Sequence, residues 1–199
     1  MEPFRRLDAI ALPVARANVD TDQIVPARYL QRPRSDDFGA YLFRDLRFDK
    51  EGRERPEFVL NQPAYRASRI VVAERNFGCG SSREHAVWAL FDYGFRVAIA
   101  PSFGDIFASN AQKNGLLTVA LPADVVATML SAIEAAPGVH LQVDLAQQAV
   151  TGPDGATHRF DIDPYAKHCL IEGLDEIAAT LTRLDDIEAY EARRARETW

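Results

Sequence analysis

The chain has 199 residues, a formal net charge of −6 and a hydrophobic content of 47%. This much apolar material can bury one sizeable core, so we expect a single domain rather than a disordered tail or a repeat array. No apolar run reaches the ~18 residues of a membrane span, and an acidic chain without a basic block lacks the charge that favours nucleic-acid binding. The first residues carry no apolar signal segment, and Cys79 and Cys169 cannot form a disulfide framework, so we expect a cytosolic enzyme or binding domain.

The first third of the chain has the pattern of strand and loop. Residues 7–14 (LDAIALPV) predict a short strand, and residues 18–26 (NVDTDQIVP) predict a polar turn followed by a short apolar stretch. Residues 28–57 are rich in arginine and aromatic side chains and hold two glycines, Gly39 and Gly52. That composition indicates a long ordered excursion, and long loops in compact domains commonly carry function.

From residue 69 onward, buried apolar runs alternate with helical patterns. Three buried strands are predicted, at residues 70–73, 97–100 and 116–121. Helices are predicted between them, one beginning at Ser81 and ending before Gly94, the other at residues 105–114. Because crossover connections are right-handed, this β-α-β-α-β order predicts a parallel sheet with helices packed on it.

The last third adds antiparallel and helical elements to this core. The predicted elements are a helix at residues 123–136, strands at 139–145 and 148–160 that form an antiparallel hairpin around the turn at 152–155, and helices at 164–172 and 175–196. The predicted fold class is therefore α/β, with a βαβαβ parallel core, added antiparallel strands and a helical tail at about residues 175–199.

Residues 78–83 form the turn that is best suited to bind an anion. Ser81 and Glu84 have the spacing of a capping box, which predicts a helix whose free N–H groups point toward this turn. Two glycines permit close backbone approach, Ser81 and Ser82 offer hydroxyls, and Arg83 offers a guanidinium. The assembly suits a carboxylate or a phosphate. The alternative is that Ser81 only caps the helix while Arg83 and Glu84 are solvated.

Several familiar motifs are absent from this turn. Arg83 stands where a dinucleotide fingerprint has its third glycine, and no phosphate-binding loop or nucleophile elbow occurs. Cys79 lies between two glycines at the expected helix start, so a reactive thiol stays open as an alternative. The histidines have no metal-ligand spacing with the cysteines, and we expect structural roles for all four: His85, His140, His158 and His168.

Residues 76–86 (NFGCGSSREHA) resemble the serine–arginine turn in the swivelling domain of the aconitase superfamily. Residues 18–30 (NVDTDQIVPARYL) resemble that family's early N-x-D-T-D-x-I-x-P segment, and the resemblance covers nearly the whole chain. It implies the swivelling β/β/α fold. A free-standing chain of this length is similar to the small subunits of the superfamily's isopropylmalate isomerases.

The resemblance implies a hydro-lyase that converts 2-isopropylmalate to 3-isopropylmalate through 2-isopropylmaleate in leucine biosynthesis. It also implies a [4Fe-4S] cluster, which two separated thiols cannot hold, so the cluster is expected on a separate large subunit that this chain needs for activity. Val25 stands where citrate-handling relatives place a serine, which fits an isopropyl group in place of one carboxylate arm. A related hydro-lyase for citraconate, 2-methylmalate or maleate stays open, as does a non-catalytic module that binds a carboxylate.

The resemblance also implies roles for individual residues. Ser81, the first serine of the turn, is implied as the catalytic base, and Asp22 as the acidic residue that orients the catalytic groups. Ser82 and Arg83 are implied to bind a substrate carboxylate. One further substrate-binding arginine is implied after the early segment, and three residues compete for this role: Arg28, Arg32 and Arg34.

Overall fold

The computed structural model describes residues 1–34 and 37–195. Residues 35–36 of the expected excursion and 196–199 of the expected tail lie outside the described residues. The strands are β1 (Arg6–Val14), β2 (Ile70–Ala73), β3 (Val97–Ala100), β4 (Leu117–Ala120), β5 (His140–Asp144), β6 (Ala149–Thr151) and β7 (Thr157–Arg159). The α-helices are α1 (Thr21–Ile24), α2 (Arg44–Arg47), α3 (Glu84–Tyr93), α4 (Asp105–Lys113), α5 (Ala123–Ala135), α6 (Pro164–Glu172), α7 (Glu176–Leu181) and α8 (Leu184–Arg194). No described helix has the length and apolar character to cross a membrane.

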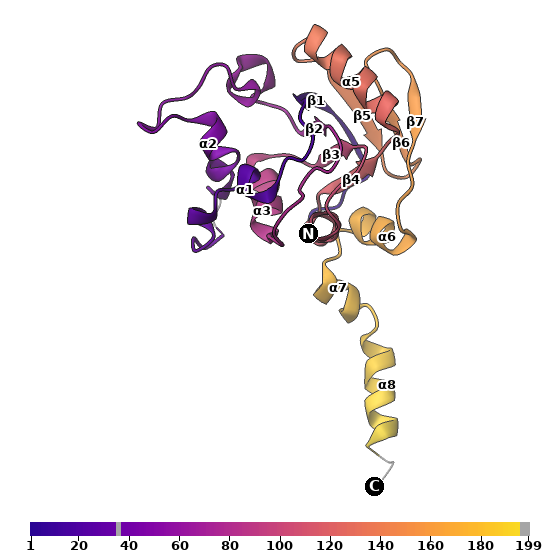
Figure 1. Ribbon diagram of the computed structural model, residues 1–199. Helices are drawn as coiled ribbons and strands as arrows, with labels where there is room; N and C mark the ends of the chain where they lie inside the picture. Colours follow the sequence, from indigo (N-terminus) through magenta and orange to yellow (C-terminus); the bar gives the residue numbers. More distant parts are fainter. Residues whose placement is uncertain (35–36, 196–199) are drawn as a thin grey trace.

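One curled sheet of seven strands forms the centre of the molecule, in the order β4-β3-β2-β1-β5-β6-β7 (Figure 1). Strands β1 to β4 pair in parallel, and β2 and β3 are buried along their whole length, as expected for strands covered on both faces. Helix α5 packs on β1, β2 and β3, while α3 and α4 pack against each other. The predicted parallel βαβαβ core is therefore confirmed.

The antiparallel half of the sheet differs from the prediction in one respect. The segment expected as one strand at 148–160 is two strands, β6 and β7, so β5, β6 and β7 form a three-stranded meander. Residues 152–156 make the turn between β6 and β7, and Asp154 stabilises it by accepting a hydrogen bond from the Ala156 N–H at 3.0 Å. The predicted turn at residues 152–155 is confirmed, and the strands on either side of it, β6 and β7, are short.

The excursion that begins at residue 28 is anchored to the domain chiefly through residues 38–43. It contains short 3₁₀ turns at Ala27–Tyr29 and Phe38–Tyr41 together with helix α2. Phe38, Leu42 and Phe43 have at most 1% of their surface exposed. Burial of three large apolar side chains supplies several kilocalories per mole in favour of this docked arrangement, at about 1.5–3 kcal/mol for each.

Gly39 permits the closest contact between the excursion and the rest of the domain. A Cβ atom at this position would lie 2.5 Å from the backbone nitrogen of Tyr93. We expect Gly39→Ala to lower the free energy of unfolding by about 1–3 kcal/mol, because the backbone of α3 cannot retreat without disturbing the core. Urea denaturation measures this, with Ala40→Ser at the neighbouring exposed position as control. An unchanged midpoint for Gly39→Ala would contradict the close packing.

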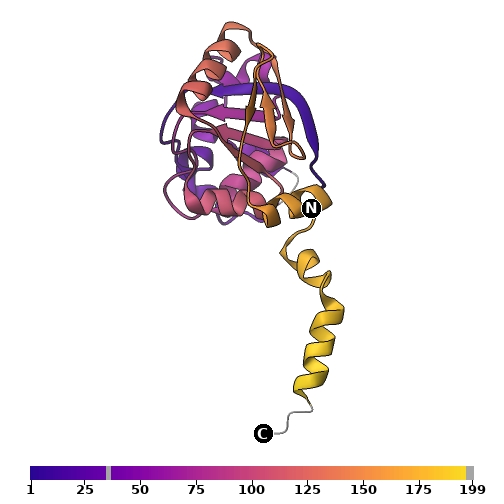
Figure 2. The same ribbon diagram turned by 90° about the vertical axis from the view of Figure 1, so that its right-hand side faces the viewer.

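The C-terminal tail is two helices rather than the single helix predicted for residues 175–196. Helix α7 ends at Leu181 and α8 begins at Leu184, and the Thr182 hydroxyl donates to the Ala179 carbonyl at 2.7 Å in the last turn of α7. Neither helix has a buried residue. Both views of the molecule show α7 and α8 extending away from the sheet and its covering helices (Figure 1 and Figure 2).

Candidate active site

The early segment and the serine–arginine turn lie directly against each other. The Gly78 N–H donates to the Val19 carbonyl at 2.8 Å, and the Thr21 N–H donates to the Cys79 carbonyl at 2.9 Å. The Thr21 hydroxyl then donates to the Ser81 carbonyl at 2.9 Å. Three hydrogen bonds therefore join two segments that are about sixty positions apart in the sequence. Thr21, which the sequence did not single out, is 2% exposed and holds the backbone of the turn.

The capping-box prediction for Ser81 and Glu84 is wrong. Helix α3 begins at Glu84, and Arg83 occupies the N-cap with an extended backbone and no side-chain cap. The helix starts late because Gly80 adopts a positive φ of 92° and the Ser81 carbonyl is bonded to Thr21. Ser81 is an exposed residue, and its side chain does not cap the helix.

Arg83 and Asp22 form an ion pair across the two segments. The side chain of Arg83 is only 15% exposed, whereas that of Asp22 is 50% exposed. The alternative in which Arg83 is merely solvated is therefore wrong. Asp22 stands on α1, where Asp20 caps the helix by accepting from the Gln23 N–H at 2.7 Å. A capped helix thus carries the carboxylate that pairs with the guanidinium.

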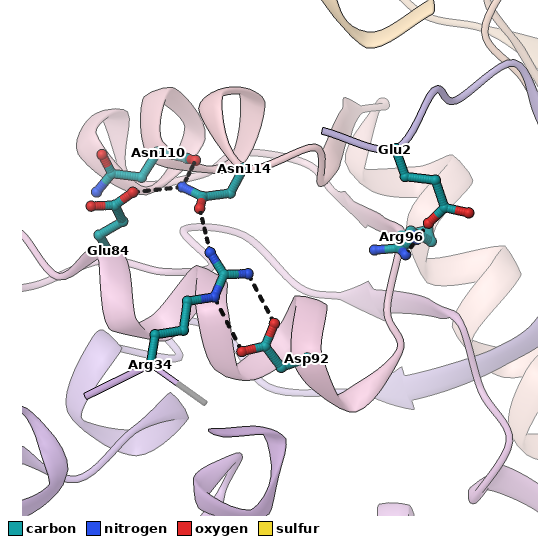
Figure 3. Close-up of polar contacts among 7 residues, drawn as sticks. All are labelled: Glu2, Arg34, Glu84, Asp92, Arg96, Asn110 and Asn114. Atoms are coloured by element: carbon teal, nitrogen blue, oxygen red, sulfur yellow. Dashed lines mark hydrogen bonds and ion pairs between the residues drawn. The ribbon is translucent and has the colours of Figure 1, made fainter. Parts of the chain in front are cut away.

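Two of the three arginines that compete for the further substrate-binding role have carboxylate partners away from the turn. Arg28 pairs with Asp45, and Arg34 pairs with Asp92 at 2.9 Å (Figure 3). The hydrogen bond from Arg28 holds the pKa of the Asp45 carboxyl below its ordinary value and raises the pKa of the guanidinium. Arg32, the third competitor, is exposed. The structure therefore brings together Asp22 and Arg83 at the turn, and it holds Arg28 and Arg34 on other partners.

The sulfur and imidazole side chains of the described residues do not gather into a metal site. Within residues 1–34 and 37–195, no three His, Cys, Asp or Glu side chains lie close enough to hold a metal ion. Cys79 is a half-buried free thiol in the turn, and Cys169 is a buried one. His85 packs on the Trp88 ring at 4.5 Å between centroids, which fits the structural role expected for it.

Gly78 is the position where the turn tolerates least change. Its φ is +72°, and an added Cβ would lie 2.2 Å from Cγ of Phe107. We expect Gly78→Ala to lower the free energy of unfolding by about 2–5 kcal/mol, through backbone strain and overpacking together. The matched control is Gly155→Ala, which has a similar φ of +80° but nothing within 4 Å of the added atom. Equal losses in the two variants by thermal unfolding would contradict the packing argument.

Comparison with known proteins agrees with this fold. A family model described as the aconitase C-terminal domain matches residues 1–124, and a second, LeuD_N, matches residues 127–164. A crystal structure of 3-isopropylmalate dehydratase from Methanocaldococcus jannaschii superposes with a TM-score of 0.66 at 23% identity, covering 94% of this chain and 99% of that one. These findings define the fold as a swivelling domain of the aconitase superfamily.

Curated relatives show to which family within the superfamily the chain belongs. The chain is 48% identical over 199 residues to a 3-isopropylmalate dehydratase small subunit from Methylobacterium radiotolerans, with all of both chains covered. It is 50% identical over 200 residues to a protein of the same name from Rhodospirillum centenum, covering 100% of this chain and 98% of that one. The chain belongs to the 3-isopropylmalate dehydratase small-subunit family.

Proposed function

We propose that this chain supplies the base and a carboxylate clamp to a 3-isopropylmalate dehydratase. The complete enzyme would convert 2-isopropylmalate to 3-isopropylmalate through 2-isopropylmaleate, a step of leucine biosynthesis. Relatives of this name that align over the whole chain support the reaction. The observation that carries the proposal is the exposed Ser81 hydroxyl in the same turn as the Asp22–Arg83 pair. A cytosolic location stays a prediction.

In this mechanism Arg83 binds a substrate carboxylate while Asp22 holds the guanidinium in place. A planar guanidinium can donate to one carboxylate on one edge and to a second on another, so the pair with Asp22 leaves donors for the substrate. Ser82 donates its hydroxyl to the same substrate carboxylate. Arg83 is largely shielded from solvent, so its charge is less screened than that of a surface arginine.

Ser81 would remove the substrate proton and return it on rehydration. A serine hydroxyl is a weak base in water, so its alkoxide needs nearby positive charge, backbone donors and a dry site. The nearby guanidinium and the free N–H groups at the start of α3 supply the first two. The turn itself is open, since Ser81 and Ser82 are both exposed. Exclusion of water therefore requires a second protein surface over this turn.

We propose that this second surface is the large subunit, which would also carry a [4Fe-4S] cluster. The two thiols of this chain do not fit such a cluster, since three cysteines are the fewest that the family uses and Cys169 is buried apart in α6. The cluster would act as a Lewis acid on the substrate hydroxyl. Every proton and carboxylate contact assigned above comes from this chain.

One of Arg28 and Arg34 is proposed as the ligand of the second substrate carboxylate, and we prefer Arg28, because Arg34 is also held by Asn114 and lies over the Trp88 ring. Each already donates to an aspartate, so either would have to exchange Asp45 or Asp92 for the substrate. Exchange of one carboxylate for another keeps the same type of charge-assisted hydrogen bond and is therefore energetically accessible.

A substrate panel tests the proposed specificity. The chain is combined anaerobically with a cluster-loaded large subunit, and kcat/KM is measured for 2-isopropylmalate, 2-methylmalate and maleate. We expect 2-isopropylmalate to be preferred by at least about tenfold, because a branched apolar group gains about 1–3 kcal/mol in a matching pocket. Preference for 2-methylmalate or maleate would assign the related hydro-lyase instead. Substrate binding without turnover of any compound would favour the non-catalytic module.

A further inference from the structure

Helix α3 carries a stripe of side chains that receives the excursion. Glu84, Trp88 and Asp92 are spaced by four residues and so lie on one face of the helix. The Arg34 guanidinium lies over the Trp88 ring, 5.4 Å from its centroid. It also makes a two-point contact with Asp92, with Nε to Oδ2 at 3.2 Å and Nη2 to Oδ1 at 2.9 Å (Figure 3). One arginine of the excursion is thus held by both an aromatic ring and a carboxylate.

Asn114 links this contact to the start of α3. It is the C-cap residue of α4, and its side-chain oxygen accepts from Arg34 Nη1 at 3.1 Å. Its side-chain nitrogen donates to Glu84 Oε1 at 2.8 Å and to the Asn110 carbonyl at 2.9 Å (Figure 3). Glu84 directly follows Arg83, the carboxylate clamp. A single amide therefore connects the excursion to the helix turn beside the site.

Three further observations separate this contact from an ordinary surface ion pair. The Asp92 side chain is 13% exposed and the Arg34 side chain 36% exposed, so this two-point pair is more shielded than the exposed pairs that contribute little. The excursion also touches α3 through its backbone, since Gly39 leaves no room for a Cβ atom against residues 92–93. Phe38 packs edge-on against the Trp88 ring with centroids 5.8 Å apart. Polar and apolar contacts thus dock the same segment on the same helix face.

We propose that Asp92 and Asn114 are positioning residues that dock the excursion on α3 through Arg34. The excursion is thereby fixed relative to Arg83, because both are tied to the same helix. The inference rests on the proposed function, in that correct placement should matter for substrate affinity and not for proton transfer at Ser81. It assigns these two residues to fixing the excursion relative to the helix that carries Arg83, with no contact to the reacting atoms.

Hydrogen exchange on the isolated chain tests the docking independently of activity. We expect Asp92→Asn and Asn114→Ala each to speed amide exchange in residues 38–43 by about tenfold or more, because a charge-assisted contact is lost. The matched control is Asp49→Asn, which removes an arginine–aspartate pair with Arg53 inside the excursion. If residues 38–43 exchange no faster in Asp92→Asn and Asn114→Ala than in Asp49→Asn, the docking role is overturned.

Kinetics of the reconstituted enzyme test the effect on the site. We expect Asp92→Asn to raise KM for 2-isopropylmalate by about tenfold while kcat stays within about twofold, and Asp49→Asn to change neither. A lower KM would mean that Asp92 competes with the substrate for Arg34, and would overturn the positioning role. An unchanged KM despite faster exchange would overturn it as well. If the wild-type complex turns over no substrate, the proposed function fails, while the exchange result still decides the docking.

Discussion

Replacing Ser81 with alanine is expected to lower kcat of the reconstituted enzyme by about three orders of magnitude or more. The hydroxyl is the proposed base, and an alanine at this exposed position removes it without opening a cavity or breaking the turn. The turn is held by backbone groups, chiefly the Ser81 carbonyl that accepts from Thr21, and these persist in the variant. KM should change only a fewfold, because the carboxylate contacts are intact.

The neighbouring serine provides the control for this substitution. Ser82→Ala removes an equally exposed hydroxyl one position away, and we expect about a tenfold loss in kcat/KM through a lost hydrogen bond to the substrate carboxylate. Steady-state rates of 2-isopropylmaleate formation measure both variants. Equal losses in the two, or a Ser81→Ala enzyme with more than a tenth of normal kcat, would contradict the assignment of the base.

Replacing Arg83 with lysine is expected to raise KM by about a hundredfold, a large effect for a change that keeps the charge. The guanidinium donates to Asp22 and to the substrate from different edges of one plane, and an ammonium cannot reproduce that geometry. The side chain is 15% exposed, so water replaces the lost contacts poorly. We expect kcat to fall less than KM rises, since Ser81 is unchanged.

An exposed arginine elsewhere in the chain is the control for this second substitution. Arg5 pairs with Glu172, and its side chain is 66% exposed, so Arg5→Lys should leave KM and kcat within about twofold of wild type. Arg83→Lys with a KM within threefold of wild type would contradict the clamp. The melting temperature of each variant separates lost binding from lost folding.

The parallel core could be predicted from the sequence because its central strands are continuous apolar runs separated by helical patterns. Residues 70–73 and 97–100 are both buried throughout, and Gly94 ends α3 as expected. The meander was predicted less well, since β6 and β7 are three residues each and too short to show a clear alternation. The break between α7 and α8 carries no proline or glycine, the residues that usually mark helix ends.

The start of α3 shows how tertiary contacts override a local motif. Ser81 and Glu84 have capping-box spacing, but the backbone is extended through Arg83 because Thr21 binds the Ser81 carbonyl. Such a contact between distant segments has no local signature. The wrong capping-box prediction concerns Ser81, the candidate catalytic residue. A serine that does not cap the helix keeps its hydroxyl free to act as the proposed base.

The site was only partly visible in the sequence. The turn and the early segment were found from their residue types and their resemblance to a known family, and the structure brings Asp22 and Arg83 into contact. The partners of Arg34 were not found, because Asp92 and Asn114 look like ordinary residues at the ends of two helices. A pair between a loop arginine and a helix carboxylate depends on how the excursion packs against α3. No short sequence pattern predicts that packing.

We propose that the active site is shared between this chain and a cluster-bearing partner. The most direct measurement follows 2-isopropylmaleate formation under anaerobic conditions for this chain alone, the large subunit alone and the mixture. We expect turnover in the mixture only, with a rate that saturates as this chain is titrated against a fixed amount of partner. Full activity of the large subunit alone, or no activity of the mixture with an intact cluster, would contradict it.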